Sequence, residues 1–137
     1  MPFPEIRHCL ICEDVRLERR RLGSLLGFYG TTPDVEILVQ DFSLLVERLA
    51  FLFMGQRGDG QYRVSVHILY GPEEAIVRSP ERRVTIPDAA RRYNLAVRLD
   101  NVRFPHPGLC TLVLLVDGQA HYQTTFEVRK GEPADFD

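Results

Sequence analysis

The feature that most constrains this chain is an alternation of apolar and polar residues in its second half. Between Gln61 and Tyr70, every second residue is apolar: Tyr62, Val64, Val66, Ile68 and Tyr70. Successive side chains of a β-strand point to opposite faces, so this pattern predicts a strand with one face in the core. Residues 94–104 repeat the pattern and predict a second strand of the same kind.

A turn sequence near the C-terminus joins two further strands. Asp117-Gly118 separates the apolar run 109–116 from the alternating run 121–128. An Asp-Gly pair readily adopts the positive φ angles of a two-residue hairpin turn. This segment is therefore predicted to form a β-hairpin.

The first half of the chain gives weaker signals. Residues 6–15 and 24–29 are predicted as strands joined by a charged segment. The apolar run 46–54 precedes a glycine-containing turn and is predicted to pair with the strand that begins at residue 61. Apolar residues over 42–53 also match helical spacing, which leaves a helix open there.

The spacing of these segments predicts an all-β fold, an antiparallel immunoglobulin-like β-sandwich of about seven or eight strands. The number includes a short strand at residues 84–86, and no alternating helices separate the strands. A length of 137 residues suits one hydrophobic core. We therefore expect a single domain over residues 1–131, followed by a flexible tail over residues 132–137.

Composition argues against several classes of protein. The net charge is −2, so bulk charge draws the chain toward neither nucleic acid nor an anionic membrane. The apolar runs are much shorter than the ~20 residues that span a bilayer, which predicts no membrane partner. The three cysteines cannot all pair, and the N-terminus lacks a signal-peptide pattern. We therefore expect a cytoplasmic protein with free thiols.

Cys9 and Cys12 have C-x-x-C spacing beside His8, which raises the hypothesis of a metal- or thiol-dependent site. A structural zinc site usually has two such pairs, and this chain has one. A redox pair needs the N-terminus of a helix, whereas the surrounding residues predict a strand, in which positions i and i+3 face opposite ways. We therefore predict two unrelated buried thiols, an incidental histidine, and no metal or cofactor; a β-bulge would keep the alternative open.

Other reactive side chains are scattered along the chain. The four histidines lie in different segments, and no G-x-S-x-G nucleophile motif accompanies them. The aspartates occur mostly one to a loop, whereas calcium needs about six to eight oxygen ligands in one place. We expect no catalytic residue and predict that the chain is not an enzyme.

The sequence contains a run of three consecutive arginines that is expected at the surface: Arg19, Arg20 and Arg21. Guanidinium groups can bind phosphate or an acidic partner through paired hydrogen bonds. A solvated loop, or an edge strand protected by its charge, is the plainer interpretation. No aromatic residues interleave with these arginines, which argues against a single-stranded nucleic acid as the partner.

The residues Cys12-Glu13-Asp14-Val15-Arg16, the following Glu18 and the segment 22–30 resemble a family of uncharacterised small bacterial proteins. Its members open with Cys-[Glu/Asp]-Asp-Val-Arg-x-Glu, a Gly-Lys segment and a Leu-Ile-Gly-Val-Tyr-like strand. Here an arginine run replaces the Gly-Lys segment. The resemblance implies a β-sandwich and transfers no catalytic residue.

These observations predict a non-catalytic interaction or ligand-binding module. Its partner would be a protein or a small ligand, and exposed edge strands favour a homodimer. The alternatives are a metal- or thiol-dependent protein that uses Cys9 and Cys12, and an arginine-mediated binder of phosphate or nucleic acid. The candidate binding residues lie where the first strand leaves the core: Glu13, Asp14, Arg16, Arg19, Arg20 and Arg21.

Overall fold

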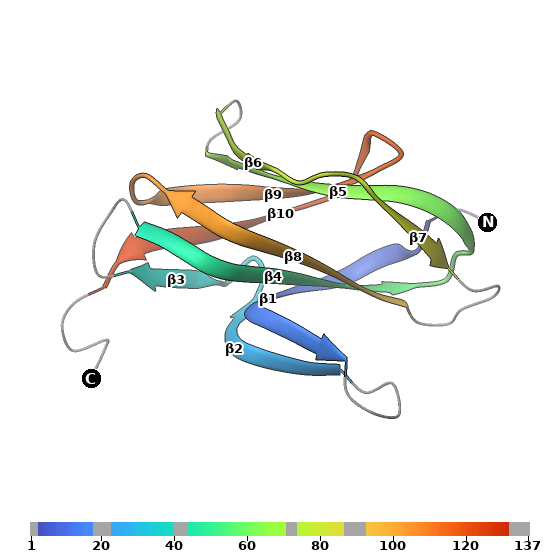
Figure 1. Cartoon of the computed structure of the whole chain (residues 1–137), viewed down its shortest axis with the longest axis horizontal. Coiled ribbons are helices and arrows are strands. Elements are labelled where there is room, and N and C mark those ends of the chain that lie inside the picture. The colour runs from blue at the N-terminus through green and yellow to red at the C-terminus, as the bar shows by residue number, and fades with distance from the viewer. Residues whose placement is uncertain (1–2, 18–22, 40–43, 71–73, 87–92, 132–137) are drawn as a thin grey trace.

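The computed structural model of the chain describes residues 3–17, 23–39, 44–70, 74–86 and 93–131. These residues form ten β-strands (Figure 1). The strands are, in chain order, β1 (Glu5–Leu17), β2 (Gly23–Thr31), β3 (Glu36–Val39), β4 (Leu44–Gln56), β5 (Gly60–Tyr70), β6 (Glu74–Arg78), β7 (Arg82–Ile86), β8 (Tyr93–Phe104), β9 (Gly108–Val116) and β10 (Gln119–Lys130). No helix long and apolar enough to cross a membrane occurs within these ranges.

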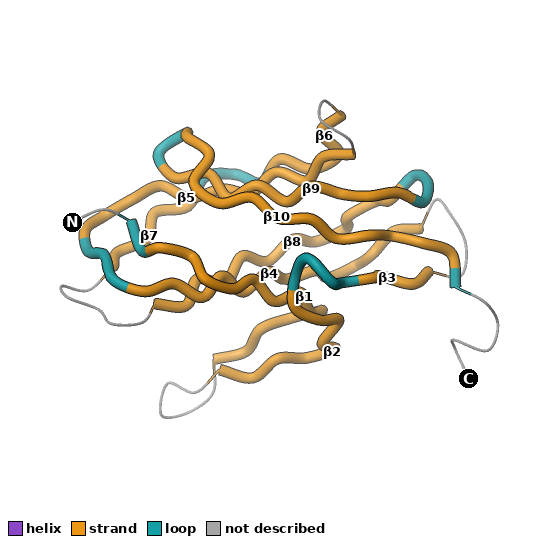
Figure 2. The backbone as a smooth tube through the Cα atoms, turned by 180° about the vertical axis from the view of Figure 1, so that it is seen from behind, coloured by secondary structure: helices purple, strands orange, loops and turns teal. Residues whose placement is uncertain are grey.

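The strands form two sheets that share one core, as both views of the backbone show (Figures 1 and 2). The first sheet has the order β2-β1-β4-β8 and is antiparallel throughout. The second has the order β3-β10-β9-β5-β6, and β7 also pairs with β5. The fold is therefore all-β with two layers.

The predicted alternation produces the core between these layers. Val64 and Val66 of β5 lie in it, as do Phe51 of β4 and Phe126 of β10. The ring of Phe126 lies 6.2 Å from that of Phe51 and 6.3 Å from that of Phe104, measured between ring centroids. Each fully buried side chain of this size contributes roughly 1.5–3 kcal/mol. Contacts between the two sheets thus hold the layers together.

The choice between strand and helix for residues 42–53 is settled in favour of a strand over the part that the structure describes. Leu49 and Phe51 of β4 face the core between the sheets, whereas Ala50 and Leu52 belong to a separate small cluster. A period of two residues is the signature of a strand. Residues 42 and 43 lie outside the described residues.

The predicted count of about seven or eight strands is wrong, and so is the expectation of purely antiparallel pairing. The described residues alone form ten strands, and β3 runs parallel to β10, with Ile37 opposite Val128. β3 has only four residues and β6 has five, with no clear alternation in burial along β6. Such short edge strands carry too little period-two signal to be recognised in sequence. The predicted tail, residues 132–137, lies outside the described residues.

β1 is held in two different ways along its length. Residues 5–12 pair with β4, and this pairing ends at the pair Cys12 and Ala50. Beyond that point, residues 14–17 pair only with β2 in the part of the chain that the structure describes. The β1–β2 hairpin therefore projects from the sheet, at the bottom of Figure 1. We call the opening between this hairpin and β4 the fork.

Candidate functional site

Both cysteines of the C-x-x-C pair are fully buried, on opposite faces of β1. Cys9 belongs to the core between the sheets, whereas Cys12 packs with Ala50, Leu52 and Ala96 in a separate cluster. Pairing between β1 and β4 is regular from Cys9 to Cys12, so no bulge brings the two thiols to one face. The structure thus confirms two unrelated buried thiols, as the strand pattern predicts.

The chemistry of the thiols follows from this burial. Burial raises the pKa of Cys9 to about 12, and the same cause raises the pKa of Cys110 to about 12. The thiolate is the form that attacks electrophiles and binds metals, so both groups are poor nucleophiles near neutral pH. Among the described residues, no group of three or more His, Cys, Asp or Glu side chains could hold a metal ion.

The structure places only part of the predicted binding set. Glu13 is exposed and follows directly after the last pair between β1 and β4. Asp14 and Arg16 lie on the part of β1 that has β2 as its only partner among the described strands. The other three candidates lie outside the described residues: Arg19, Arg20 and Arg21.

Glu13 lines a hollow in the fork with a volume of about 370 Å³. Its walls come from three strands: Glu13 of β1, Tyr29 of β2, and Val46, Glu47 and Arg48 of β4. Over residues 44–49, β4 pairs only with β8 among the described strands. The hollow therefore adjoins a strand edge that has no neighbour on the fork side in the described part of the chain.

A second hollow adjoins the first and shares Tyr29 with it. Its volume is about 510 Å³, and its walls are Tyr29, residues 33–36, Leu109 of β9 and Glu127 of β10. Leu109 is 59% exposed and lies opposite Glu127 in the β9–β10 pairing. An exposed leucine beside carboxylates offers an apolar contact at an otherwise charged surface. We call the two hollows together the acidic double hollow.

The acidic double hollow carries an excess of negative charge. Its lining includes five carboxylates and one arginine, Arg48. The carboxylates are Glu13, Asp34, Glu36, Glu47 and Glu127. Arg129 forms an ion pair with Glu36, with 3.1 Å between Nε and Oε2. Both side chains of that pair are well exposed, so the pair contributes little stability and can rearrange.

Tyr29 lines both hollows. Burial raises the pKa of the Tyr29 hydroxyl, and the negative charge of Glu13 raises it further. The hydroxyl therefore stays protonated at neutral pH and can donate a hydrogen bond. Its ring face and the nearby carboxylates can both attract an ammonium or guanidinium group.

Sequence reasoning identified one member of this site, Glu13, and missed Tyr29, Glu47 and Leu109. These residues come from three strands that meet only in the folded chain. Tyr29 lies in the segment that carries the family resemblance, which assigns it no role, and Glu47 and Leu109 belong to no motif. Asp34, one of the aspartates that lie singly in loops, lines the second hollow as well.

Comparison with known proteins identifies the family. The family of unknown function DUF6941 matches residues 8–129 of the chain. The chain belongs to this family. The match agrees with the predicted resemblance to an uncharacterised family, and it covers all ten strands except the ends of β1 and β10.

This DUF6941 chain covers only part of the length of its curated relatives. Quinolinate synthase from Caulobacter vibrioides (strain NA1000 / CB15N) is 32% identical over 111 residues, which are 76% of this chain and 30% of that protein. Quinolinate synthase from the strain ATCC 19089 / CIP 103742 / CB 15 gives the same values. The chain thus spans 30% of the length of these relatives.

Solved structures that resemble the DUF6941 chain do so at low TM-scores. An immunoglobulin-like protein from Pseudomonas aeruginosa has 15% identity and a TM-score of 0.33, over 87% of this chain and 91% of that one. A β-glucosidase from Listeria innocua in complex with isofagomine has 10% identity and a TM-score of 0.43. That match covers 72% of this chain and 15% of the β-glucosidase chain. A DNA-bound alkylpurine DNA glycosylase from Pseudomonas fluorescens has 16% identity and a TM-score of 0.38. That match covers 72% of this chain and 28% of the glycosylase chain.

Proposed function

We propose that this DUF6941 protein is a non-catalytic, immunoglobulin-like interaction module that binds an extended, positively charged segment of a partner protein in the fork. The observation that carries the proposal is the convergence of the one-sided edge of β4 with five carboxylates around Tyr29. Main-chain groups at such an edge supply affinity, and the side chains around it supply specificity.

The main-chain part of this binding uses residues 44–49 of β4. An edge strand presents N–H and C=O groups that an added strand can pair with. Because successive side chains of an added strand alternate between faces, every second residue of the partner would point toward the hollow. A partner with a basic residue at every second position would then direct its basic side chains toward Glu13 and Glu47.

The electrostatic part of the binding is local. The whole chain carries a net charge of only −2, so the acidic double hollow and not the bulk charge would direct a basic partner. The carboxylates at its rim are exposed, and exposed charges are screened within about 8–10 Å at physiological salt. We therefore expect binding that weakens as the salt concentration rises.

The two alternatives have less support. The thiol- or metal-dependent alternative would need Cys9 and Cys12 on one face, and they lie on opposite faces. The arginine-mediated alternative depends on Arg19, Arg20 and Arg21, which lie outside the described residues, so it stays a prediction.

Calorimetric titration of the full chain with a short synthetic peptide that alternates arginine and valine tests the proposal. We expect the arginine peptide to bind and a matched peptide with glutamate in place of arginine not to bind. The double change Glu13→Gln and Glu47→Gln should weaken binding by about tenfold, since each removes one charge-assisted contact. Glu81→Gln is the matched control, because Glu81 is exposed and lines neither hollow.

A second peptide separates main-chain pairing from simple charge attraction. Methylation of alternate backbone nitrogens keeps the charge and removes the donors that an added strand needs. Strand addition predicts that this peptide loses most of its affinity. Equal binding of the two peptides would contradict strand addition, and equal weakening by Glu81→Gln would contradict the assignment of the acidic double hollow.

A further inference from the structure

β1 contains a bulge that turns two consecutive polar side chains to the same side. Ile6 pairs with Gly55 and His8 pairs with Met54, so Arg7 is an extra residue between these two pairs. Ile6 is buried in the core, whereas Arg7 and His8 are both exposed. In a regular strand, two consecutive side chains would face opposite ways. Bulges are frequent beside functional sites because they re-aim side chains in this manner.

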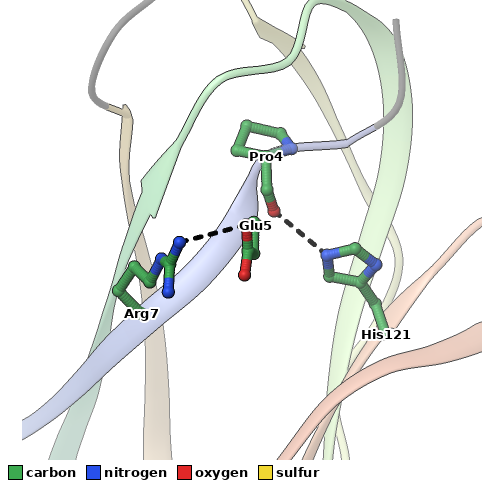
Figure 3. Close-up of polar contacts among 4 residues, drawn as sticks. All are labelled: Pro4, Glu5, Arg7 and His121. Carbon is green, nitrogen blue, oxygen red and sulfur yellow. Dashed lines mark hydrogen bonds and ion pairs between the residues drawn. The ribbon is translucent and has the colours of Figure 1, made fainter.

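The packing around residue 55 fixes this bulge. A Cβ atom at Gly55 would lie 2.9 Å from Cβ of Pro4 and 3.3 Å from the carbonyl oxygen of Glu5. Only glycine allows β1 to approach β4 this closely without displacement. The same segment is held from the second sheet, where Nε2 of His121 lies 3.0 Å from the carbonyl oxygen of Pro4 (Figure 3). The bulge therefore presents its side chains from a rigid base.

Arg7 and His8 line a hollow of about 180 Å³ in the first sheet. Met54, Gln56 and Asn94 line it as well. His8, Met54 and Asn94 occupy one row across β1, β4 and β8, because His8 pairs with Met54 and Met54 pairs with Asn94. At ~30 Å³ for each molecule of liquid water, the hollow has room for about six waters, and so for a small polar ion.

The polar groups of this hollow are suited to an anion. Arg7 supplies guanidinium N–H donors, His8 a ring N–H, and Gln56 and Asn94 amide N–H groups. None of the residues that line the hollow is acidic. The carboxylate of Glu5 competes with an anion for Arg7, since Nη2 of Arg7 lies 3.4 Å from Oε2 of Glu5 (Figure 3). More than half of each of these side chains is exposed, so an incoming anion displaces the pair at little cost.

We propose that this hollow binds a small oxyanion, either a phosphate or a carboxylate group, between Arg7, His8 and Asn94. The planar guanidinium of Arg7 matches two oxygens of either group at once. His8 and Asn94 approach from opposite sides of Met54, which is half-buried between them. The site is separate from the fork and does not depend on the function proposed there.

NMR titration of the full chain with inorganic phosphate, and separately with acetate, tests the proposal. We expect a saturable shift of the His8 imidazole resonance with at least one of them. Tighter binding of phosphate assigns the site to phosphoryl groups, and tighter binding of acetate assigns it to carboxylates. Arg7→Gln should weaken binding by about tenfold, as expected for one charge-assisted contact, and Asn94→Ala should weaken it by a smaller factor.

Arg98→Gln provides the matched control. Arg98 is exposed on the same sheet and does not line the hollow, so the change removes the same charge without removing a ligand. The proposal is overturned if neither anion gives a saturable shift of His8, or if Arg98→Gln weakens binding as much as Arg7→Gln does. Thermal unfolding of both variants measures whether either change affects the fold. Binding of the arginine peptide in the fork should be unchanged by Arg7→Gln, which separates the two proposals.

Discussion

The two halves of β1 differ in which strand holds them, with both β2 and β4 paired only over Leu10–Cys12 among the described strands. In the first half, β1 pairs with β4, and Cys9 and Ile11 are completely buried there. In the second half, β1 has only β2 as a partner among the described strands, and Glu13 is exposed at the point of departure. A single strand, β1, thus contributes its first half to the core and Glu13 to the candidate site. Where β1 no longer pairs with β4, residues 44–49 of β4 are left with an edge that no described strand covers.

The largest expected difference between the two halves is in stability. Ile11→Ala removes a fully buried side chain at a position where β1 pairs with both β2 and β4, and it should lower the free energy of unfolding by about 2–5 kcal/mol. Val46→Ala, at the half-buried wall of the fork, should cost about 1 kcal/mol or less. Urea unfolding of both variants measures the difference. Equal costs would contradict the distinction between the buried part of β1 and the wall of the fork.

A smaller difference concerns alkaline pH and belongs to the first half. The pKa of Cys9 is about 12 in the folded chain, against an ordinary value of 9.0. Between these values the unfolded chain loses a proton that the folded chain keeps, so stability falls as the pH rises. The slope should be about 1.4 kcal/mol per pH unit for this thiol.

Cys9→Ala provides the test of this slope. Urea unfolding at a series of alkaline pH values should show a shallower fall in stability for the variant than for the unmodified chain. The comparison concerns slopes, so the cavity left by the shorter side chain does not affect it. Identical slopes would show that Cys9 ionises as readily in the folded chain as in the unfolded one.

The smallest expected effect is electrostatic and belongs to the second half. The charge of Glu13 helps to raise the pKa of Tyr29, so Glu13→Gln should lower that pKa. NMR titration of chain carrying carbon-13-labelled tyrosine would follow the Tyr29 ring carbon directly. Glu81→Gln should leave the pKa of Tyr29 unchanged. A Tyr29 titration that is the same in all three proteins would place Glu13 outside the acidic double hollow.

Much of the fold could be predicted because, in its long strands, the alternation of apolar and polar residues indicates which side chains are buried. Val64 and Val66 of β5, and Leu95 and Leu99 of β8, alternate with polar residues and lie in the core as expected. β3 and β6 could not be predicted in this way, because each is a short edge strand positioned by one neighbour. The parallel pairing of β3 with β10 joins segments that are far apart in the chain, and no local pattern encodes it.

The sites were less predictable than the fold. Glu13 was identified because the apolar pattern of the first strand stops there. His8 was expected to be incidental, and the structure instead places it in a hollow beside Arg7. The reason is a bulge whose close packing depends on Gly55, a residue of a different strand. A feature that depends on contacts between distant segments leaves no signal in either segment alone.

Amide hydrogen exchange of β4, with and without the arginine peptide, tests the central claim most directly. Fork-facing amides within residues 44–49 should exchange faster than those within residues 50–56, which lie between β1 and β8. Saturation with the peptide should slow exchange at the fork-facing amides and leave the amides of residues 5–12 unchanged. Unchanged exchange over residues 44–49 in the peptide-saturated protein would contradict binding in the fork.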